Sequence, residues 1–273
     1  MNQNKNTFII PSHWEVPPSL STMYFEKRKN IIVLVPVFNE GERIISLISK
    51  MAENKIHEYA DICIVDAGST DSSLDHEHHI KNSIRGVVTR AKGVSGRLGS
   101  DLRIGFAFGL SEGYDYFITI DGNNKDDPRS IINFVSALKN GDAQYIQASR
   151  FITGGIAINT PVTRKIAIKF IHSPLLSLFS GFRWTDTTQG FRGYTSKLLS
   201  DERLGLFRNC FVSYEILSYL TYRVPQLGYA CLELPSTRSY PKGEVPTKIS
   251  FIRGNGRVLL ILFLTCLGYY NIK

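Results

Sequence analysis

The chain has little cysteine, and what it has is scattered. Its 273 residues include four cysteines and no CxxC pair. Dispersed thiols inside apolar segments are usually small buried side chains in a reducing compartment. We therefore predict neither a disulfide nor a zinc site from Cys63, Cys210, Cys231 and Cys266.

Long hydrophobic runs are also missing. The apolar stretch that begins at Val258 extends to Tyr270 at most, well short of the roughly 20 residues that a membrane-spanning helix needs. Near the N-terminus, Phe8-Ile9-Ile10 is too short for the apolar core of a signal peptide. These absences predict a chain that stays in the cytoplasm.

Two nucleotide-binding motifs are absent as well. The first strand is not followed by GxGxxG, which argues against a dinucleotide dehydrogenase. A nucleotidyltransferase is expected to open with a glycine-rich phosphate loop, and Pro36-Val37-Phe38-Asn39-Glu40 is not one. Nucleotide chemistry of another kind stays open.

The formal net charge of +8 suits an anionic partner such as a nucleotide sugar, a phospholipid surface or nucleic acid. Nucleic acid is the weakest of the three because the chain has no recognisable nucleic-acid-binding motif and no dense Lys/Arg stripe. We expect no nucleic-acid partner.

Two apolar runs end in an aspartate, at Asp66 and at Asp121, and each is followed by a glycine-containing turn. Short runs rich in β-branched and aromatic residues, stopped by a turn signal, are typical of buried parallel strands. Both acids are then expected at the carboxyl edge of one sheet, where open α/β sheets bind ligands.

Strand and helix patterns alternate around these acids, which predicts an α/β fold with a mostly parallel sheet flanked by helices. The predicted strands cover residues 31–38, 62–66, 86–89, 116–121 and 143–148, and the predicted helices cover 40–53, 98–112 and 128–140. We predict one catalytic domain over residues 30–245, an N-terminal extension over 1–29 and a C-terminal apolar helical tail over 246–273.

Two segments combine basic and apolar residues, 159–182 and 253–270. The first is either a core helix or a surface that meets lipid. The second is expected to dock on the domain, on a second copy of the chain in a homo-oligomer, or in the membrane interface, where its arginines would meet lipid headgroups.

Five short motifs occur in order along the chain. They are Val35–Glu40 (VPVFNE), Asp66–Asp71 (DAGSTD), Leu98–Ser100 (LGS), Asp121–Asn123 (DGN) and Thr185–Arg192 (TDTTQGFR). In this order they resemble family 2 of the inverting glycosyltransferases, which have the GT-A (Rossmann-like) fold, over about residues 30–245.

Further motifs are similar to two subgroups of that family. Ser149-Arg150-Phe151, Gly190-Phe191-Arg192 and Leu232–Pro235 resemble the polyprenyl-phosphate glycosyltransferases of the dolichol-phosphate mannose synthase type. Thr237–Gly243 and Pro246–Ser250 are similar to bacterial transferases of surface-polysaccharide assembly.

The resemblance implies a nucleoside-diphosphate sugar as donor. It implies that Asp66 accepts hydrogen bonds from the base or ribose. It also implies that Glu40 lines the nucleoside pocket, although an acid that stabilises the start of a helix explains Glu40 equally well. The donor-site residues that the resemblance implies are Pro36, Phe38, Glu40, Asp66, Gly99, Asp121 and Gly122.

In the family an Asp-x-Asp turn holds a divalent cation, which stabilises the departing diphosphate. Here Asp121 and Asn123 would hold Mg²⁺ or Mn²⁺, more weakly because the amide adds no charge. Asp121 also fits a ribose contact or a plain turn at a strand end. Asp126 and Asp127 precede Pro128, and we favour capping of the next helix as their role.

The acceptor of the sugar is either a hydroxyl group or a phosphate, and the two require different residues. A hydroxyl acceptor needs a base, and Asp186 is the candidate, although an acid among hydroxyls is equally a turn or cap residue. A phosphate acceptor is already ionised and needs cations instead. By resemblance the acceptor and phosphate-binding residues are Arg150, Arg164, Gln189, Arg192 and Arg238.

We therefore expect metal-assisted, inverting transfer of a hexose-type sugar to a lipid-linked or polyprenyl-phosphate acceptor in cell-surface glycan assembly, at the inner face of the membrane. Asp121 and Asp186 are the expected catalytic residues. The alternatives are a nucleotidyltransferase and a nucleotide-binding scaffold without activity. The scaffold is considered because Ala67 and Asn123 stand where the family commonly has a second carboxylate.

Overall fold

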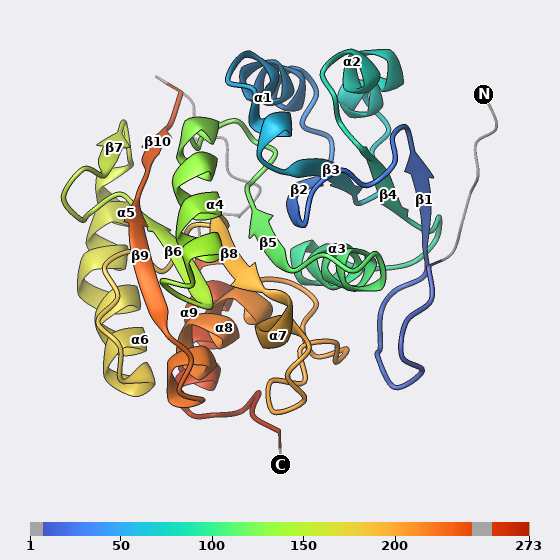
Figure 1. Ribbon diagram of the computed structural model, residues 1–273. Helices are drawn as coiled ribbons and strands as arrows, with labels where there is room; N and C mark the ends of the chain where they lie inside the picture. The colour runs from blue at the N-terminus through green and yellow to red at the C-terminus, as the bar shows by residue number, and fades with distance from the viewer. Residues whose placement is uncertain (1–7, 242–252, 273) are drawn as a thin grey trace.

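An eight-stranded mixed sheet forms the centre of the computed structural model, which describes residues 8–241 and 253–272. The strand order is β1-β4-β3-β2-β5-β8-β6-β9, and β7 and β10 form a separate two-stranded sheet (Figure 1). The strands are β1 (Ser19–Met23), β2 (Ile31–Val37), β3 (Asp61–Asp66), β4 (Gly86–Arg90), β5 (Tyr116–Thr119), β6 (Tyr145–Ser149), β7 (Ile156–Ile158), β8 (Arg192–Thr195), β9 (Cys231–Pro235) and β10 (Thr237–Ser239).

The predicted parallel arrangement is confirmed for four strand pairs, β2–β3, β2–β5, β3–β4 and β6–β9. β8 lies antiparallel between β5 and β6, and no strand was predicted there. β1 pairs antiparallel with β4. Part of the predicted N-terminal extension is therefore an edge strand of the main sheet.

The helices cover both faces of the sheet. They are α1 (Glu42–Glu53), α2 (His76–Lys81), α3 (Leu98–Ser111), α4 (Ile131–Asn140), α5 (Val162–Ala167), α6 (Ser173–Ser180), α7 (Ser196–Leu199), α8 (Glu215–Gln226) and α9 (Arg253–Cys266). Short 3-10 turns lie at η1 (Ile56–Glu58), η2 (Ser72–Leu74) and η3 (Pro128–Ser130), and η4 (Ile168–His172) is a π-helical turn between α5 and α6.

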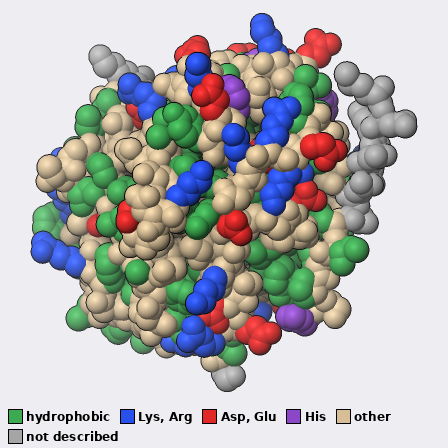
Figure 2. All heavy atoms as spheres, viewed as in Figure 1, with side chains coloured by type: hydrophobic (Ala, Val, Ile, Leu, Met, Phe, Trp, Pro, Cys, Tyr) green, Lys and Arg blue, Asp and Glu red, His purple; other side chains and the backbone are tan. Residues whose placement is uncertain are grey.

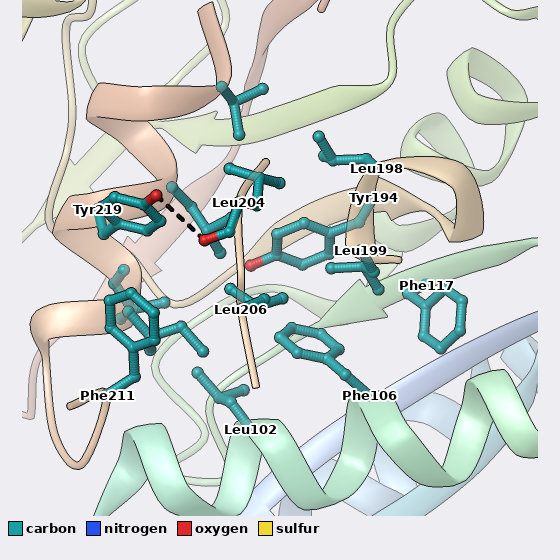
Figure 3. Packing of buried hydrophobic residues seen from close by; sticks show 14 of the residues in the cluster. Leu102, Phe106, Phe117, Tyr194, Leu198, Leu199, Leu204, Leu206, Phe211 and Tyr219 are labelled. Carbon is teal, nitrogen blue, oxygen red and sulfur yellow. Dashed lines mark hydrogen bonds between the residues drawn. The ribbon is translucent and has the colours of Figure 1, made fainter. Parts of the chain in front are cut away.

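Alternation along β2 explains the two cores. Ile31, Val33 and Val35 face α1 and α4, whereas Ile32 and Leu34 face α3 and the cluster that α8 and α9 complete. Side chains of a strand point alternately to the two faces of a sheet. Figure 3 shows part of the second cluster, where aromatic and leucine side chains from α3, β5, α7, β8 and α8 meet.

The helix boundaries follow the expected capping signals. The Asp127 side chain accepts a hydrogen bond from Arg129 N at the start of η3, so its predicted capping role is confirmed. At the other end of this helical segment, Gly141 takes the left-handed conformation with φ 76°, which a residue with a side chain adopts only with strain.

The C-terminal helix docks on the domain itself, one of the three predicted outcomes. Leu262 and Cys266 of α9 are buried in the core cluster, and α9 packs against α8 and α6. Arg257 also forms an ion pair with Glu215 of α8 at 3.5 Å. Within residues 8–241 and 253–272, no helix is long and apolar enough to cross a bilayer.

Basic and acidic side chains are interspersed over the face of the molecule that Figure 2 shows. The positive net charge is therefore not gathered into a single basic stripe on this face.

Candidate active site

The carboxyl ends of β2, β3 and β5 meet at one edge of the sheet, as the sequence predicts. Hydrogen bonds join the two loops that follow β2 and β3: Thr70 N donates to Asn39 Oδ1 at 2.8 Å, and Asn39 N donates to Ser69 Oγ at 3.0 Å. Phe38 is 47% exposed beside these loops. An aromatic ring exposed to this extent suits the predicted place of Phe38 in a nucleoside pocket.

Pro36 and Glu40 are less accessible than Phe38. Pro36 is half-buried within β2, and the Glu40 carboxylate lies 3.4 Å from the Arg43 guanidinium. Glu40 also comes just before α1, so the helix-start explanation and the predicted donor contact both fit its position.

Two predicted nucleoside contacts are not supported by the structure. Asp66 is fully buried, and its carboxylate accepts hydrogen bonds from Gly68 N at 2.9 Å and Ser69 N at 3.0 Å. The Asp66 carboxylate therefore stabilises the loop that follows β3. Gly99 lies beneath residues 211–213, where an added Cβ would come within 2.6 Å of the Ser213 carbonyl oxygen. The absence of a side chain at Gly99 allows the backbone of residues 211–213 to pack this closely.

The acidic turn after β5 is built on close backbone packing. An added Cβ at Gly122 would come within 2.9 Å of the Pro36 carbonyl oxygen, and one at Gly190 would overlap Asp121 Oδ1. Glycine is required at both positions for this reason. Asn123 lies next to Asp121, with its Nδ2 3.5 Å from Asp121 Oδ2. The roles of Asp121, Gly122 and Asn123 in holding a donor or a metal ion stay predictions.

Arg238 of β10 binds the acidic turn. Its Nη2 lies 3.0 Å from Asp121 Oδ2, and its Nη1 pairs with Asp126 Oδ2. Asp126 is almost fully buried, so the prediction that it caps a helix is wrong: it is the buried counter-ion of Arg238. Arg238 was predicted to bind acceptor phosphate, and in this structure its partners are the two carboxylates.

These residues fit a divalent cation only when other ligands come with it. Among the described residues, no group of three His, Cys, Asp or Glu side chains is placed to hold a metal ion. Asp121 and Asn123 supply one charged and one neutral oxygen. Mg²⁺ is commonly bound through one or two carboxylates together with substrate phosphates, so this turn suits a cation carried by a diphosphate.

Several cations surround the Tyr240 ring, which is almost fully buried. Arg164 Nη1 donates to the Tyr240 hydroxyl at 2.9 Å. The Lys125 ammonium and the Arg238 guanidinium lie 5.1 Å and 5.9 Å from the ring centroid. Burial alone would raise the pKa of Tyr240, but Arg238, Arg164 and Arg150 outweigh it and lower the pKa to about 8.

Sequence reasoning gave Tyr240 and Lys125 no role. Arg238 and Tyr240 are two apart on an extended segment, and such residues point to the same face. That spacing is the signal that could have placed Tyr240 beside Arg238. For Lys125 no comparable signal exists, because its place depends on a contact with a residue more than 100 positions away.

Asp186 does not have the accessibility of a base. It is fully buried, and Arg150 clamps its carboxylate through Nε at 2.6 Å and Nη2 at 3.0 Å. Gln189 Nε2 donates to it at 2.8 Å. Although burial raises the pKa of Asp186, the charge of Arg150 and these hydrogen bonds outweigh it, and the pKa is lowered. A weakly basic, fully engaged carboxylate is suited to positioning Arg150.

Two further predicted acceptor residues are also internal. Arg192 is fully buried and donates to Leu217 O at 2.7 Å, the Tyr145 hydroxyl at 2.8 Å and Gln189 O at 2.9 Å. Gln189 is likewise buried and spans Ala148, Asp186 and Ser236. In this structure the two side chains hold the loop after α6 to β6 and α8, and their contact with an acceptor stays a prediction.

Two of the predicted cations lie near Tyr240. Arg164 is half-exposed at the start of α5. Arg150 Nη1 is buried and has no hydrogen-bond partner among the residues that the structure describes. Both guanidinium groups lie close enough to Tyr240 to lower its pKa, so they mark one cationic region beside the acidic turn.

The chain is similar to several known proteins. The model of the family described as glycosyl transferase family 2 matches residues 32–203. Undecaprenyl-phosphate mannosyltransferase of Micrococcus luteus is 25% identical over 207 residues, which cover 76% of this chain and 82% of the relative. Polyprenol monophosphomannose synthase of Mycolicibacterium smegmatis is 27% identical over 210 residues, 76% of each chain.

Among solved structures, glucosyl-3-phosphoglycerate synthase from Mycobacterium tuberculosis, in complex with Mn²⁺ and UDP-glucose, superposes with a TM-score of 0.59 at 19% identity, over 87% of this chain and 79% of that one. A likeness at this identity shows the fold, and it confirms the predicted GT-A architecture. Together with the family model, which spans more than half of the sequence, it leads to one conclusion: the chain belongs to glycosyl transferase family 2, and it is a glycosyltransferase.

Proposed function

We propose that this glycosyltransferase moves a hexose, with inversion, from a nucleoside-diphosphate sugar to the phosphate of a lipid-linked acceptor of the polyprenyl-phosphate type. The observation that carries the proposal is the contrast between Asp186 and the cations near it. Asp186, the candidate base, is clamped by Arg150, whereas Arg164 is half-exposed and lies with Arg150 and Arg238 near Tyr240.

A phosphate acceptor matches this set of groups. One of its oxygens attacks the anomeric carbon from the side opposite the leaving group, and the bond from that carbon to the diphosphate oxygen breaks with its electron pair. No proton has to be removed, because the phosphate is ionised at neutral pH. Arg164 would neutralise the approaching phosphate through charge-assisted hydrogen bonds, and Arg150, paired with Asp186, would contribute through Nη1 only.

On the donor side, the residues of the chain orient the nucleoside diphosphate. Phe38 would stack on the base, and Asp121 with Asn123 would hold Mg²⁺ or Mn²⁺ against the diphosphate. The bound cation supplies Lewis-acid stabilisation of the leaving group. Gly190 leaves room for the Asp121 side chain, which is 23% exposed.

An apolar surface next to the cations would deliver the acceptor. On α5, η4 and α6, side chains such as Phe170 (74% exposed) and Leu178 (76% exposed) point outward, and α9 adds Phe263 (60% exposed). α6 packs against α9. The exposed apolar side chains of these helices, which we propose form one surface, are Val162, Ile166, Phe170, Ile171, Leu178, Phe179, Leu259, Leu260, Phe263 and Leu267.

Basic residues share the same helices. Lys165 and Lys169 are exposed on α5 and η4, and Arg257 is half-exposed on α9. Apolar helical faces bordered by Lys and Arg are typical of segments that lie in the interface of anionic membranes. We therefore propose that this surface rests on an anionic bilayer, at the inner face of the membrane. Arg164 belongs to α5, so it would lie at the depth of lipid phosphates.

The names of the two relatives support the acceptor class, since both describe transfer to a polyprenyl phosphate. The test is transfer from a panel of nucleoside-diphosphate hexoses to a short-chain polyprenyl phosphate and to the matching polyprenol, followed by mass spectrometry. The proposal predicts product from the phosphate alone. Product from the polyprenol instead would contradict it.

Replacement of Arg164 sharpens this test. Arg164→Gln removes one charge-assisted hydrogen bond to the acceptor, typically ~1.5–3 kcal/mol, so the KM for polyprenyl phosphate should rise roughly 10- to 150-fold while the KM for the donor is unchanged. Arg129→Gln, at an exposed pair with Asp127, is the matched control. An unchanged acceptor KM in Arg164→Gln would place the acceptor phosphate elsewhere.

A further inference from the structure

Arg238 shares its guanidinium between two carboxylates that differ in accessibility. Its Nη1 pairs with Asp126, whose side chain is fully buried, and its Nη2 lies 3.0 Å from Asp121 Oδ2, whose side chain is 23% exposed. The ion pair with Asp126 is thus buried. Asp121 is the one of the two carboxylates that a ligand from solvent can reach.

The main chain holds this arrangement in register. Asp127 N donates to Thr237 O at 3.0 Å, and Ser239 N donates to Lys125 O at 2.8 Å. β10 is therefore tied to the acidic turn itself, on both sides of Arg238. An exchange of partners by Arg238 then requires only rotation of its side chain about a fixed backbone.

The cations at the turn oppose a free dication. Asp121 and Asp126 pair with Arg238, and Lys125 interacts with both Arg238 and Asp121. Arg164 adds a further positive charge near Lys125. The attraction of the carboxylates for a free dication is therefore offset by repulsion from these cations. A dication that arrives on a diphosphate brings its own counter-charge.

We propose that Arg238 occupies Asp121 in the donor-free protein and yields it to a divalent cation that arrives with the nucleoside diphosphate, turning Nη2 to a diphosphate oxygen while Nη1 stays on Asp126. The planar fork of a guanidinium can hold a carboxylate and a phosphate oxygen at once. Arg238 is then a positioning residue that makes metal binding conditional on donor binding. This inference rests on the proposed nucleoside-diphosphate donor.

The test is Mn²⁺ binding to the full chain, measured by electron paramagnetic resonance with and without UDP or GDP. In the unmodified protein, Mn²⁺ alone should bind weakly, and a nucleotide should tighten it. In Arg238→Gln, the affinity for Mn²⁺ alone should rise about tenfold, equivalent to ~1.4 kcal/mol, and the gain from nucleotide should shrink. Equal or weaker Mn²⁺ binding in Arg238→Gln, including no measurable binding to either protein, would overturn the proposal.

Arg238→Gln leaves Asp126 as an unpaired buried charge, which is strongly destabilising. The double variant Asp126→Asn/Arg238→Gln removes both charges and should show the same rise in Mn²⁺ affinity in a folded protein. Arg203→Gln, at an exposed pair with Asp201, is the control and should leave Mn²⁺ binding unchanged. Because Mn²⁺ binding involves no acceptor, a failure of sugar transfer to polyprenyl phosphate is distinguishable from a failure of this inference.

Discussion

Replacement of Asp186 by asparagine separates a structural carboxylate from a catalytic base. The carboxylate is fully buried and is held by two bonds from the Arg150 guanidinium, with further bonds from Arg150 N, Thr188 and Gln189. Asp186→Asn leaves the Arg150 charge buried without its counter-ion, a change that typically costs ~3–5 kcal/mol. Because asparagine keeps one acceptor oxygen, we expect a loss of about 3 kcal/mol, or roughly 6–12 °C in Tm for a chain of this size.

The pH dependence of this loss is also set by the structure. The pKa of Asp186 is lowered, because Arg150 and the hydrogen bonds outweigh burial. A depressed carboxyl pKa stabilises the fold fully above the unfolded-state value of ~3.9, and that stability is lost as pH falls through the folded-state pKa. The difference in unfolding free energy between the two proteins should therefore be constant from about pH 5 to pH 8 and narrow only below about pH 4.

The assay is urea unfolding followed by fluorescence, with transfer to polyprenyl phosphate measured on the folded fraction. Glu58→Gln, at an exposed pair with Lys55, is the control and should change stability by less than about 1 kcal/mol. The reasoning is refuted if Asp186→Asn unfolds like the unmodified protein but slows transfer by several powers of ten at an unchanged KM, since that is the behaviour of a base.

Three further outcomes follow from the same geometry. An absorbance titration should show one phenol with a midpoint near 8; Tyr240→Phe should remove it and Arg164→Gln should raise it, and an unmoved midpoint in Arg164→Gln would contradict the proposed cause. Phe170→Asp should abolish flotation with anionic vesicles without lowering Tm, because the ring is 74% exposed; unchanged flotation would place the membrane contact elsewhere. Gly190→Ala should slow transfer by ~100-fold, because a methyl group there displaces Asp121; full activity would show that the position of this carboxylate is unimportant.

Much of the fold could be predicted because its signals are local. The apolar runs that became β2, β3 and β5 are buried on both faces, so each carries its own pattern. β8 and β10 carry no such pattern. β8 is a four-residue strand inserted antiparallel between two others, and β10 pairs with β7 some 80 residues earlier in the chain. Pairings of this kind depend on tertiary context rather than on local sequence.

The candidate site could likewise be predicted only in part. Asp121 could be placed at the sheet edge, because a strand end and a glycine mark it. The roles of Asp66, Asp186 and Arg192 could not be separated from the sequence, since a charged side chain in a polar motif looks the same whether it faces a ligand or an internal partner. The partners decide the role, and they are distant: Arg150 lies 36 residues from Asp186, and Arg238 lies 117 residues from Asp121.

The most direct test of the proposed function is the structure of the product formed from a nucleoside-diphosphate hexose, polyprenyl phosphate and the purified protein. The account predicts a hexose joined through its anomeric carbon to the lipid phosphate, with the anomeric configuration opposite to that of the donor, as phosphorus and proton magnetic resonance would show. A product that carries the sugar on a hydroxyl group, or one with retained configuration, would contradict it.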